Sequence, residues 1–133
     1  MNYIVLYLDD EPGNLRSFYS VYRREFKIFI CGSVEEALKV LDENKVDLVI
    51  TDQIMPKISG VEFLKMVAER YPNKPPNRMI VSGYADNQDI DVARKDYGLF
   101  KFVSKPWDPK EFQNIMNEAI EACKTPLNNP QKS

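Results

Sequence analysis

Residues 3–12 read YIVLYLDDEP, an apolar run from Tyr3 to Leu8 that ends in three acidic residues and a proline. A strand buried on both faces has this composition, because neither face can carry polar side chains. An amphipathic segment follows, with apolar residues at helical spacing (Leu15, Phe18, Tyr19 and Tyr22). The opening stretch therefore predicts a buried strand, an acidic turn and a helix.

The same alternation of apolar and amphipathic runs occurs five times along the chain. Further strands are predicted at residues 27–31, 47–51, 78–82 and 99–103. The sequences SVEE (33–36) and SGVE (59–62) predict capping boxes at two helix starts, and Asp108 predicts the cap of the last helix. The helix at about 86–97 has the thinnest apolar face and is expected to stop at Gly98. Five strand–helix units in a row predict an α/β fold, with a parallel sheet covered by helices on both faces.

The composition excludes several classes of protein. The 133 residues fit one domain, and the net charge of -2 with scattered basic residues does not favour a nucleic-acid binder. No apolar stretch approaches the roughly 20 residues needed to span a membrane, and no secretory signal is recognisable. Cys31 and Cys123 are expected to be reduced thiols in a cytoplasmic protein. Because the chain has no histidine, serine–histidine and cysteine–histidine catalysis is excluded, and any phosphohistidine must belong to another protein.

Polar side chains fall where the predicted strands end. Asp9 and Asp10 follow the first strand, Asp52 the third, Ser82 ends the fourth and Lys105 follows the fifth. Sites in open parallel sheets lie at the carboxyl ends of the strands. Each residue alone has an ordinary explanation as a turn former or a surface side chain. The hypothesis of a site depends on all five lying at one edge of the sheet.

Converging carboxylates at this edge require a cation. Two like charges about 4 Å apart repel by about 1 kcal/mol in water and roughly 4 kcal/mol at an effective dielectric constant near 20. Mg²⁺ prefers oxygen ligands and is commonly held by one or two carboxylates together with water and phosphate. Lys105 and Ser82 could both reach a phosphoryl group, and a carboxylate is a competent nucleophile toward phosphorus. The residues thus predict phosphoryl chemistry with Mg²⁺.

Four motifs carry a resemblance to a known family: YLDDEP (7–12), TDQIMPKISG (51–60), VSGYAD (81–86) and FVSKPW (102–107). In this order and spacing they resemble the receiver domains of two-component response regulators, over Tyr3 to Cys123. The resemblance implies a single doubly wound, flavodoxin-like (βα)5 domain with strand order 2-1-3-4-5. The domain would span residues 1–123, and residues 124–133 would form a polar tail or linker.

The resemblance also implies a role for each acidic residue. Asp52 would accept the phosphoryl group. Asp10 and Asp52 would ligate Mg²⁺ directly with the backbone carbonyl of Ile54, and Asp9 would act mostly through water.

Ser82 and Phe102 would form the switch, beside Lys105. Lys105 would contact the phosphoryl group, Ser82 would turn toward it, and the rotamer of Phe102 would follow Ser82. Phe102 has no hydroxyl group, so a tyrosine hydrogen bond cannot contribute at this position. The Lys105-Pro106 bond would be cis.

The implied function is a switch and not an enzyme. A sensor histidine kinase or a histidine phosphotransfer protein would be the partner, and the family indicates a bacterial source. The changed surface would be the fourth helix, fifth strand and fifth helix, and the output would be a changed partner or a homodimer. Ile54 and Tyr84 would flank the line of attack on phosphorus, so we hypothesise slow self-dephosphorylation.

Three alternatives remain open at the level of sequence. An aspartyl phosphatase of the haloacid-dehalogenase type expects Asp-x-Asp after the first strand, whereas Asp9 and Asp10 are adjacent. A pseudo-receiver would share the fold without being phosphorylated. A flavodoxin-like flavin binder needs a phosphate-binding loop after the first strand, where three acidic residues would repel the phosphate.

Overall fold

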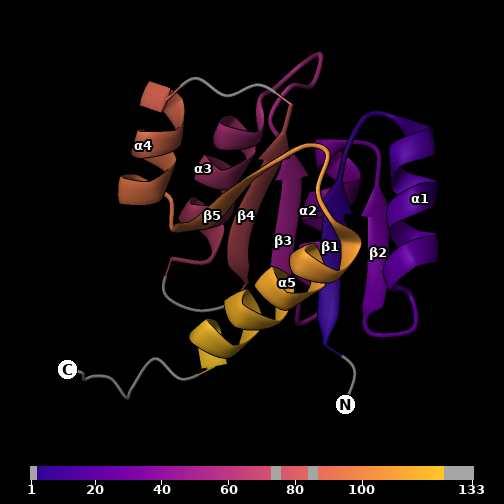
Figure 1. The fold of residues 1–133 in the computed structure, drawn as a ribbon. Helices are drawn as coiled ribbons and strands as arrows, with labels where there is room; N and C mark the ends of the chain where they lie inside the picture. The colour runs from indigo at the N-terminus through magenta and orange to yellow at the C-terminus, as the bar shows by residue number, and fades with distance from the viewer. Residues whose placement is uncertain (1–2, 73–75, 84–86, 125–133) are drawn as a thin grey trace.

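The computed structural model describes residues 3–72, 76–83 and 87–124. Strands and helices alternate from the first described strand to the last described helix (Figure 1). The strands are β1 (Ile4–Leu8), β2 (Lys27–Cys31), β3 (Leu48–Asp52), β4 (Asn77–Ser82) and β5 (Leu99–Ser104). The helices are α1 (Pro12–Tyr22), α2 (Val34–Glu43), α3 (Gly60–Arg70), α4 (Asn87–Asp96) and α5 (Pro109–Lys124).

The strands form one parallel sheet in the order β2-β1-β3-β4-β5. The predicted α/β fold, strand order and five strand–helix units are thereby confirmed. Each strand lies within one residue of its predicted bounds. The predicted tail at 124–133 falls outside the described residues, apart from the backbone of Lys124.

Helices cover both faces of the sheet, and each face has its own apolar core (Figure 1). One core lies under α2, α3 and α4 (it includes Leu6, Leu8, Ala37, Phe63, Leu64, Ile80 and Ala93). The other lies under α1 and α5 (it includes Val5, Tyr7, Phe18, Tyr22, Phe112 and Met116). Strands β1, β3 and β4 are buried on both faces, which explains their continuous apolar runs. Among the described residues, no helix is long and apolar enough to cross a membrane.

The helix caps confirm most of the predicted signals and correct one. Ser59 forms the full capping box with Glu62 at the start of α3. The full box predicted at Ser33 is wrong: the Ser33 hydroxyl accepts from the Glu36 amide, but the Glu36 carboxylate accepts from Gly32. The backbone of Ser33 is more extended, with φ of -146° against -80° at Ser59, so its own amide does not reach the glutamate.

The last two helices have the predicted boundary signals. Asp108 caps α5 by accepting a hydrogen bond from the Glu111 amide at 2.9 Å. Gly98 follows α4 with φ of +74°, a conformation that costs other residues more than glycine.

A buried arginine joins the carboxyl-terminal ends of two helices. Arg78, at the start of β4, is 7% exposed. Its guanidinium donates to the carbonyl oxygen of Tyr71, directly after α3, at 2.6 Å and to that of Tyr97, directly after α4, at 3.3 Å. A Cβ atom at Gly98 would collide with this guanidinium, so both the close approach and the positive φ favour glycine there.

An exposed ion pair connects α2 with α3. Arg70 Nη1 lies 2.8 and 2.7 Å from the two carboxylate oxygens of Asp42, and the Tyr71 hydroxyl donates to the same carboxylate. The Tyr71 hydroxyl and the Arg70 guanidinium together hold the pKa of Asp42 below its usual value.

Candidate functional site

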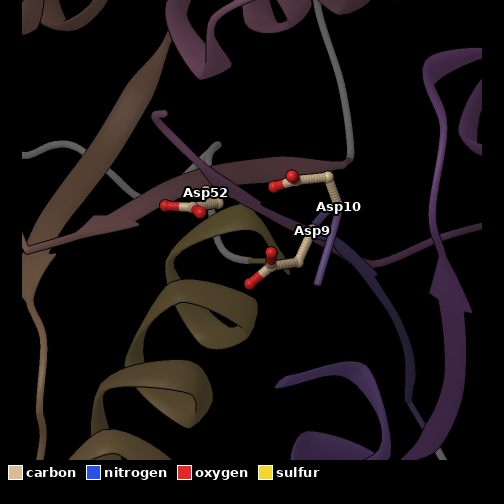
Figure 2. Close-up of side chains that lie close together, drawn as sticks. All are labelled: Asp9, Asp10 and Asp52. Carbon is tan, nitrogen blue, oxygen red and sulfur yellow. The ribbon is translucent and has the colours of Figure 1, made fainter. Parts of the chain in front are cut away.

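Three aspartates meet where β1 and β3 end, as Figure 2 shows. Each of Asp9, Asp10 and Asp52 offers one carboxylate oxygen within 4.8 Å of the other two. Strands β1 and β3 are adjacent and parallel, so residues that follow one and end the other are brought together. Asp9 and Asp52 are buried, whereas Asp10 is exposed. The predicted convergence of acidic residues is confirmed.

Asp9 is fully buried and surrounded by hydrogen-bond donors. Its Oδ2 accepts from the Tyr7 hydroxyl at 2.9 Å and from Asn14 Nδ2 at 3.1 Å, and it lies 3.4 Å from Lys105 Nζ. Its Oδ1 accepts from the Glu11 amide at 3.0 Å. Tyr7 and Asn14 were not among the predicted site residues. Tyr7 lies two residues before Asp9, and the period-two alternation of β1, continued by one residue past Leu8, places both side chains on the same face.

The loop after Asp52 is held against the end of β3. The Gly60 amide donates to the Gln53 carbonyl at 3.0 Å, and the Val61 amide donates to Gln53 Oε1 at 2.9 Å. A Cβ atom at Gly60 would lie 2.5 Å from the Asp52 carbonyl oxygen. Glycine therefore allows the start of α3 to pack directly on the backbone of Asp52. Gln53 and Gly60 support the position of this aspartate, and neither was predicted from the sequence to do so.

Lys105 completes the site from the other half of the sheet. Its Nζ lies 3.5 Å from Asp52 Oδ2, a distance similar to that from Asp9. The Lys105 amide donates to the Ser82 carbonyl at 2.9 Å, which joins the loop after β5 to the end of β4. The Lys105-Pro106 bond is cis, as expected. Ser82 is 1% exposed and ends β4.

Competing effects act on the pKa of the Asp52 carboxyl group. Burial raises the pKa of its carboxyl group, the Lys105 ammonium lowers it, and the Asp9 carboxylate raises it again. The net direction is upward. Burial and the neighbouring Asp9 also raise the pKa of Tyr7 well above its usual value, so its hydroxyl is a donor at neutral pH.

Three other residues were predicted to act at this site. Ile54 lies two residues after Asp52 and is 58% exposed. Phe102 in β5 is partly buried and packs against the core under α2, α3 and α4. Tyr84, expected to flank the phosphoryl group, lies outside the described residues.

One protein-family model matches most of this chain. Residues 5–117 match the model of the response regulator receiver domain. The chain belongs to the response regulator receiver family. Receiver domains typically are phosphorylated and use Mg²⁺ at an acidic pocket, and they interact with histidine kinases or phosphotransfer proteins.

Individual relatives agree with this membership. The hydrogenase transcriptional regulatory protein HoxA of Bradyrhizobium diazoefficiens is 35% identical over 117 residues, which cover 88% of this chain and 24% of HoxA. The transcriptional regulatory protein GlrR of Escherichia coli is 30% identical, over 88% of this chain and 26% of GlrR. This receiver domain thus spans about a quarter of the length of these curated relatives.

Solved structures agree on the fold. A response regulator receiver domain from Clostridium thermocellum has a TM-score of 0.82 at 28% identity, covering 92% of this chain and 97% of that one. The signal receiver domain of an HD domain-containing protein from Pseudomonas fluorescens has a TM-score of 0.85 at 23% identity, covering 93% and 98% of the two chains.

Proposed function

We propose that this receiver domain accepts a phosphoryl group on Asp52, with Mg²⁺ bound beside it, and thereby switches an interaction surface. One observation carries the proposal: the Asp52 carboxylate lies 3.5 Å from Lys105 Nζ and within 4.8 Å of carboxylate oxygens of Asp9 and Asp10. We place the phosphoacceptor module within residues 1–123 and treat residues 124–133 as a polar tail or linker.

The donor set fits Mg²⁺. It consists of carboxylate oxygens on two adjacent strand ends, and hard oxygen ligands suit this ion. Asp10, Asp52 and the backbone carbonyl of Ile54 would hold it, while Asp9 would contribute charge and contacts through water. The ion would neutralise the negative charge of phosphoryl oxygens next to the nucleophile.

Asp52 and Lys105 have different roles in the transfer of the phosphoryl group. A carboxylate oxygen of Asp52 attacks phosphorus and forms the new O–P bond as the P–N bond of a partner's phosphohistidine breaks. The bonding pair stays on the imidazole nitrogen, which takes up a proton from solvent as it leaves. Lys105, which already faces Asp52, neutralises charge on the transferred group. Since this chain has no histidine, the donor is a sensor histidine kinase or a histidine phosphotransfer protein.

The added charge of about -1.5 to -2 then biases the switch. Ser82 lies at the end of β4, and the Lys105 amide contacts its carbonyl, so a change at the phosphoryl group reaches this strand end directly. Ser82 turns toward the phosphoryl group and Phe102 changes rotamer. The surface formed by α4, β5 and α5 changes in response and binds a different partner or a second copy of the domain.

The domain acts as a stoichiometric acceptor and not as an enzyme with an external substrate. Mass spectrometry after incubation with acetyl phosphate and Mg²⁺ tests this proposal. We expect a gain of one phosphoryl group in the wild type and none in Asp52→Asn. Failure of the wild type to gain it, together with no spectral response to beryllofluoride, would favour a pseudo-receiver. Continuous hydrolysis of a generic phosphate ester would favour a phosphatase.

The persistence of the phosphorylated state is a separate question. We propose that Ile54 and Tyr84 hinder the water that hydrolyses the aspartyl phosphate. The position of Ile54 two residues after Asp52 and its 58% exposure support this proposal. Phosphate release from the loaded domain should take many minutes and should accelerate in Ile54→Ala. A lifetime of seconds in the wild type would contradict this.

A further inference from the structure

Gln53, directly after Asp52, is a buried glutamine that is only 4% exposed. Glutamine is seldom buried to this extent, because its amide loses hydrogen bonds to water unless protein groups replace them. Its side-chain Oε1 accepts from the Val61 amide at 2.9 Å, and its backbone carbonyl accepts from the Gly60 amide at 3.0 Å. The bond to Val61, the second residue of α3, is what glutamine provides here and an apolar side chain would not.

Gln53 holds both ends of the loop between β3 and α3. On the sheet side, its amide donates to the Val81 carbonyl of β4 at 3.1 Å. On the helix side, its two carbonyl oxygens accept from the first two amides of α3. Between these ends, residues 54–58 make no hydrogen bond within the part of the chain that the structure describes, although the Met55 side chain packs against the core. The backbone of this loop therefore depends on Gln53 for its position.

We propose that Gln53 is a positioning residue for the metal: by holding this loop, it fixes the carbonyl of Ile54 before Mg²⁺ binds. This inference rests on the proposed function, in which that carbonyl and the Asp52 carboxylate are ligands. A site that is in place in only a fraction of molecules binds with an affinity reduced by that fraction. Gln53 lies between the two ligand residues in the chain, so its hydrogen bonds restrain both of them.

The contact between Gln53 and α3 is close and leaves little room for water. A Cβ atom at Gly60 would lie 3.0 Å from both Oε1 and Cα of Gln53, and Val61 is 8% exposed. A buried amide that loses its acceptor destabilises the arrangement that contains it. Removing Oε1 therefore favours arrangements of the loop in which the Val61 amide reaches water, and in these the Ile54 carbonyl is no longer held.

Gln53→Met is the test variant, because methionine keeps the length of the side chain and lacks the acceptor. Ser59→Ala is its matched control. The Ser59 hydroxyl accepts from the Glu62 amide at 3.1 Å, so both variants remove one side-chain acceptor from the first turn of α3. Both should lower the urea midpoint of the metal-free domain. Only Gln53 adjoins the proposed metal ligands, so only its replacement should change the affinity for the metal.

Calorimetry with magnesium chloride measures that affinity. In Gln53→Met we expect Mg²⁺ to bind about fivefold more weakly, which corresponds to about 1 kcal/mol, the net contribution of one hydrogen bond. Ser59→Ala should bind Mg²⁺ as tightly as the wild type, in spite of its lower urea midpoint.

Amide hydrogen exchange tests the same coupling in the wild type, without a substitution. Because coupling between two equilibria is reciprocal, saturating Mg²⁺ should slow exchange of the Val61 amide by at least about fivefold. The Glu62 amide, which Ser59 holds in the same turn, is the internal control and should be slowed less.

The outcomes separate this inference from the proposed function. If the wild type binds no Mg²⁺ or gains no phosphoryl group from acetyl phosphate, the proposed function fails and this inference fails with it. If the wild type does both, but Gln53→Met keeps its Mg²⁺ affinity or Ser59→Ala loses as much, the role of Gln53 is overturned while the proposed function stands. Equal slowing of exchange at Val61 and Glu62 would overturn it as well. Weaker Mg²⁺ binding in Gln53→Met alone, with slower exchange at Val61, supports it.

Discussion

Replacing Gly60 with alanine would place a Cβ atom 2.5 Å from the Asp52 carbonyl oxygen and 3.0 Å from Gln53 Cα. Both atoms belong to the backbone and cannot rotate away. Relief requires the start of α3 to move from the end of β3, which strains the hydrogen bonds from the Gly60 and Val61 amides to Gln53. The substitution therefore perturbs the segment that supports the phosphoacceptor candidate.

The expected change in the free energy of unfolding is the sum of three contributions. Two of them destabilise the fold and one stabilises it. Forcing extra volume into a packed site costs about 1–3 kcal/mol. A weakened hydrogen bond adds about 1 kcal/mol. Alanine in place of glycine in a helix returns up to about 1 kcal/mol. We expect a net loss of about 2 kcal/mol, or roughly 6–8 °C in melting temperature for a domain of this size.

Thermal unfolding followed by circular dichroism provides the assay, with Gly13→Ala as its control. Gly13 also lies in the first turn of a helix, but a Cβ atom there would meet no heavy atom within 4 Å. The control should be neutral or stabilised by up to about 1 kcal/mol. A melting temperature of Gly60→Ala at or above that of the wild type would refute the steric argument.

Three further predictions concern other parts of the fold. The lowered pKa of Asp42 means that its ionised carboxylate stabilises the fold above the usual carboxyl pKa of about 4, and that this stabilisation is lost as the pH falls through the lowered pKa. Asp42→Asn should therefore lose less stability than the wild type as the pH falls below about 4. Urea unfolding over that range checks this, and parallel curves would contradict it. Burial raises the pKa of the Cys31 thiol to about 12, so in a Cys123→Ser background a thiol reagent should react slowly with native protein and rapidly in denaturant. Equal rates would show that Cys31 is accessible. Ser59→Ala and Ser33→Ala should each lower the free energy of unfolding by about 1 kcal/mol, because each removes an N-cap acceptor, and unchanged urea midpoints would count against these caps.

The convergence of the acidic site could be predicted because it depends on topology more than on side-chain detail. In a parallel sheet every strand ends at the same edge, and β1 and β3 are neighbours, so Asp10 and Asp52 had to lie near one another once these strands and their order were recognised. Lys105 follows β5, two strands from β3, and that it reaches Asp52 depends on the loop after β5 and on its own side chain. The roles of Ile54 and Phe102 came from the family resemblance and stay predictions, because they concern a bound ion and a phosphorylated state.

The hydrogen bond from Tyr7 to Asp9 was harder to predict from the sequence. Tyr7 lies in an apolar run and is predicted as a core residue, and its ring is indeed buried. Its hydroxyl matters only because the ring stacks on Phe18 at an angle that places the oxygen on Asp9, a detail of packing. The two capping boxes show the same limit. Ser33 and Ser59 have equivalent sequences, but the backbone φ of the capping residue decides which amide the glutamate reaches.

The guanidinium of Arg78 holds the carboxyl-terminal end of α4. It anchors the chain directly after α3 and directly after α4. Arg78 lies near the start of β4, at the edge of the sheet opposite to the one where the aspartates lie. A helix of 10 residues is about 15 Å long, so a tilt of roughly 10° about this anchor would carry the far end of α4 by about 2.5 Å while its base stays in place. A tilt of α4 about this anchor would therefore displace its amino-terminal end, which follows β4, farther than any other part of the helix.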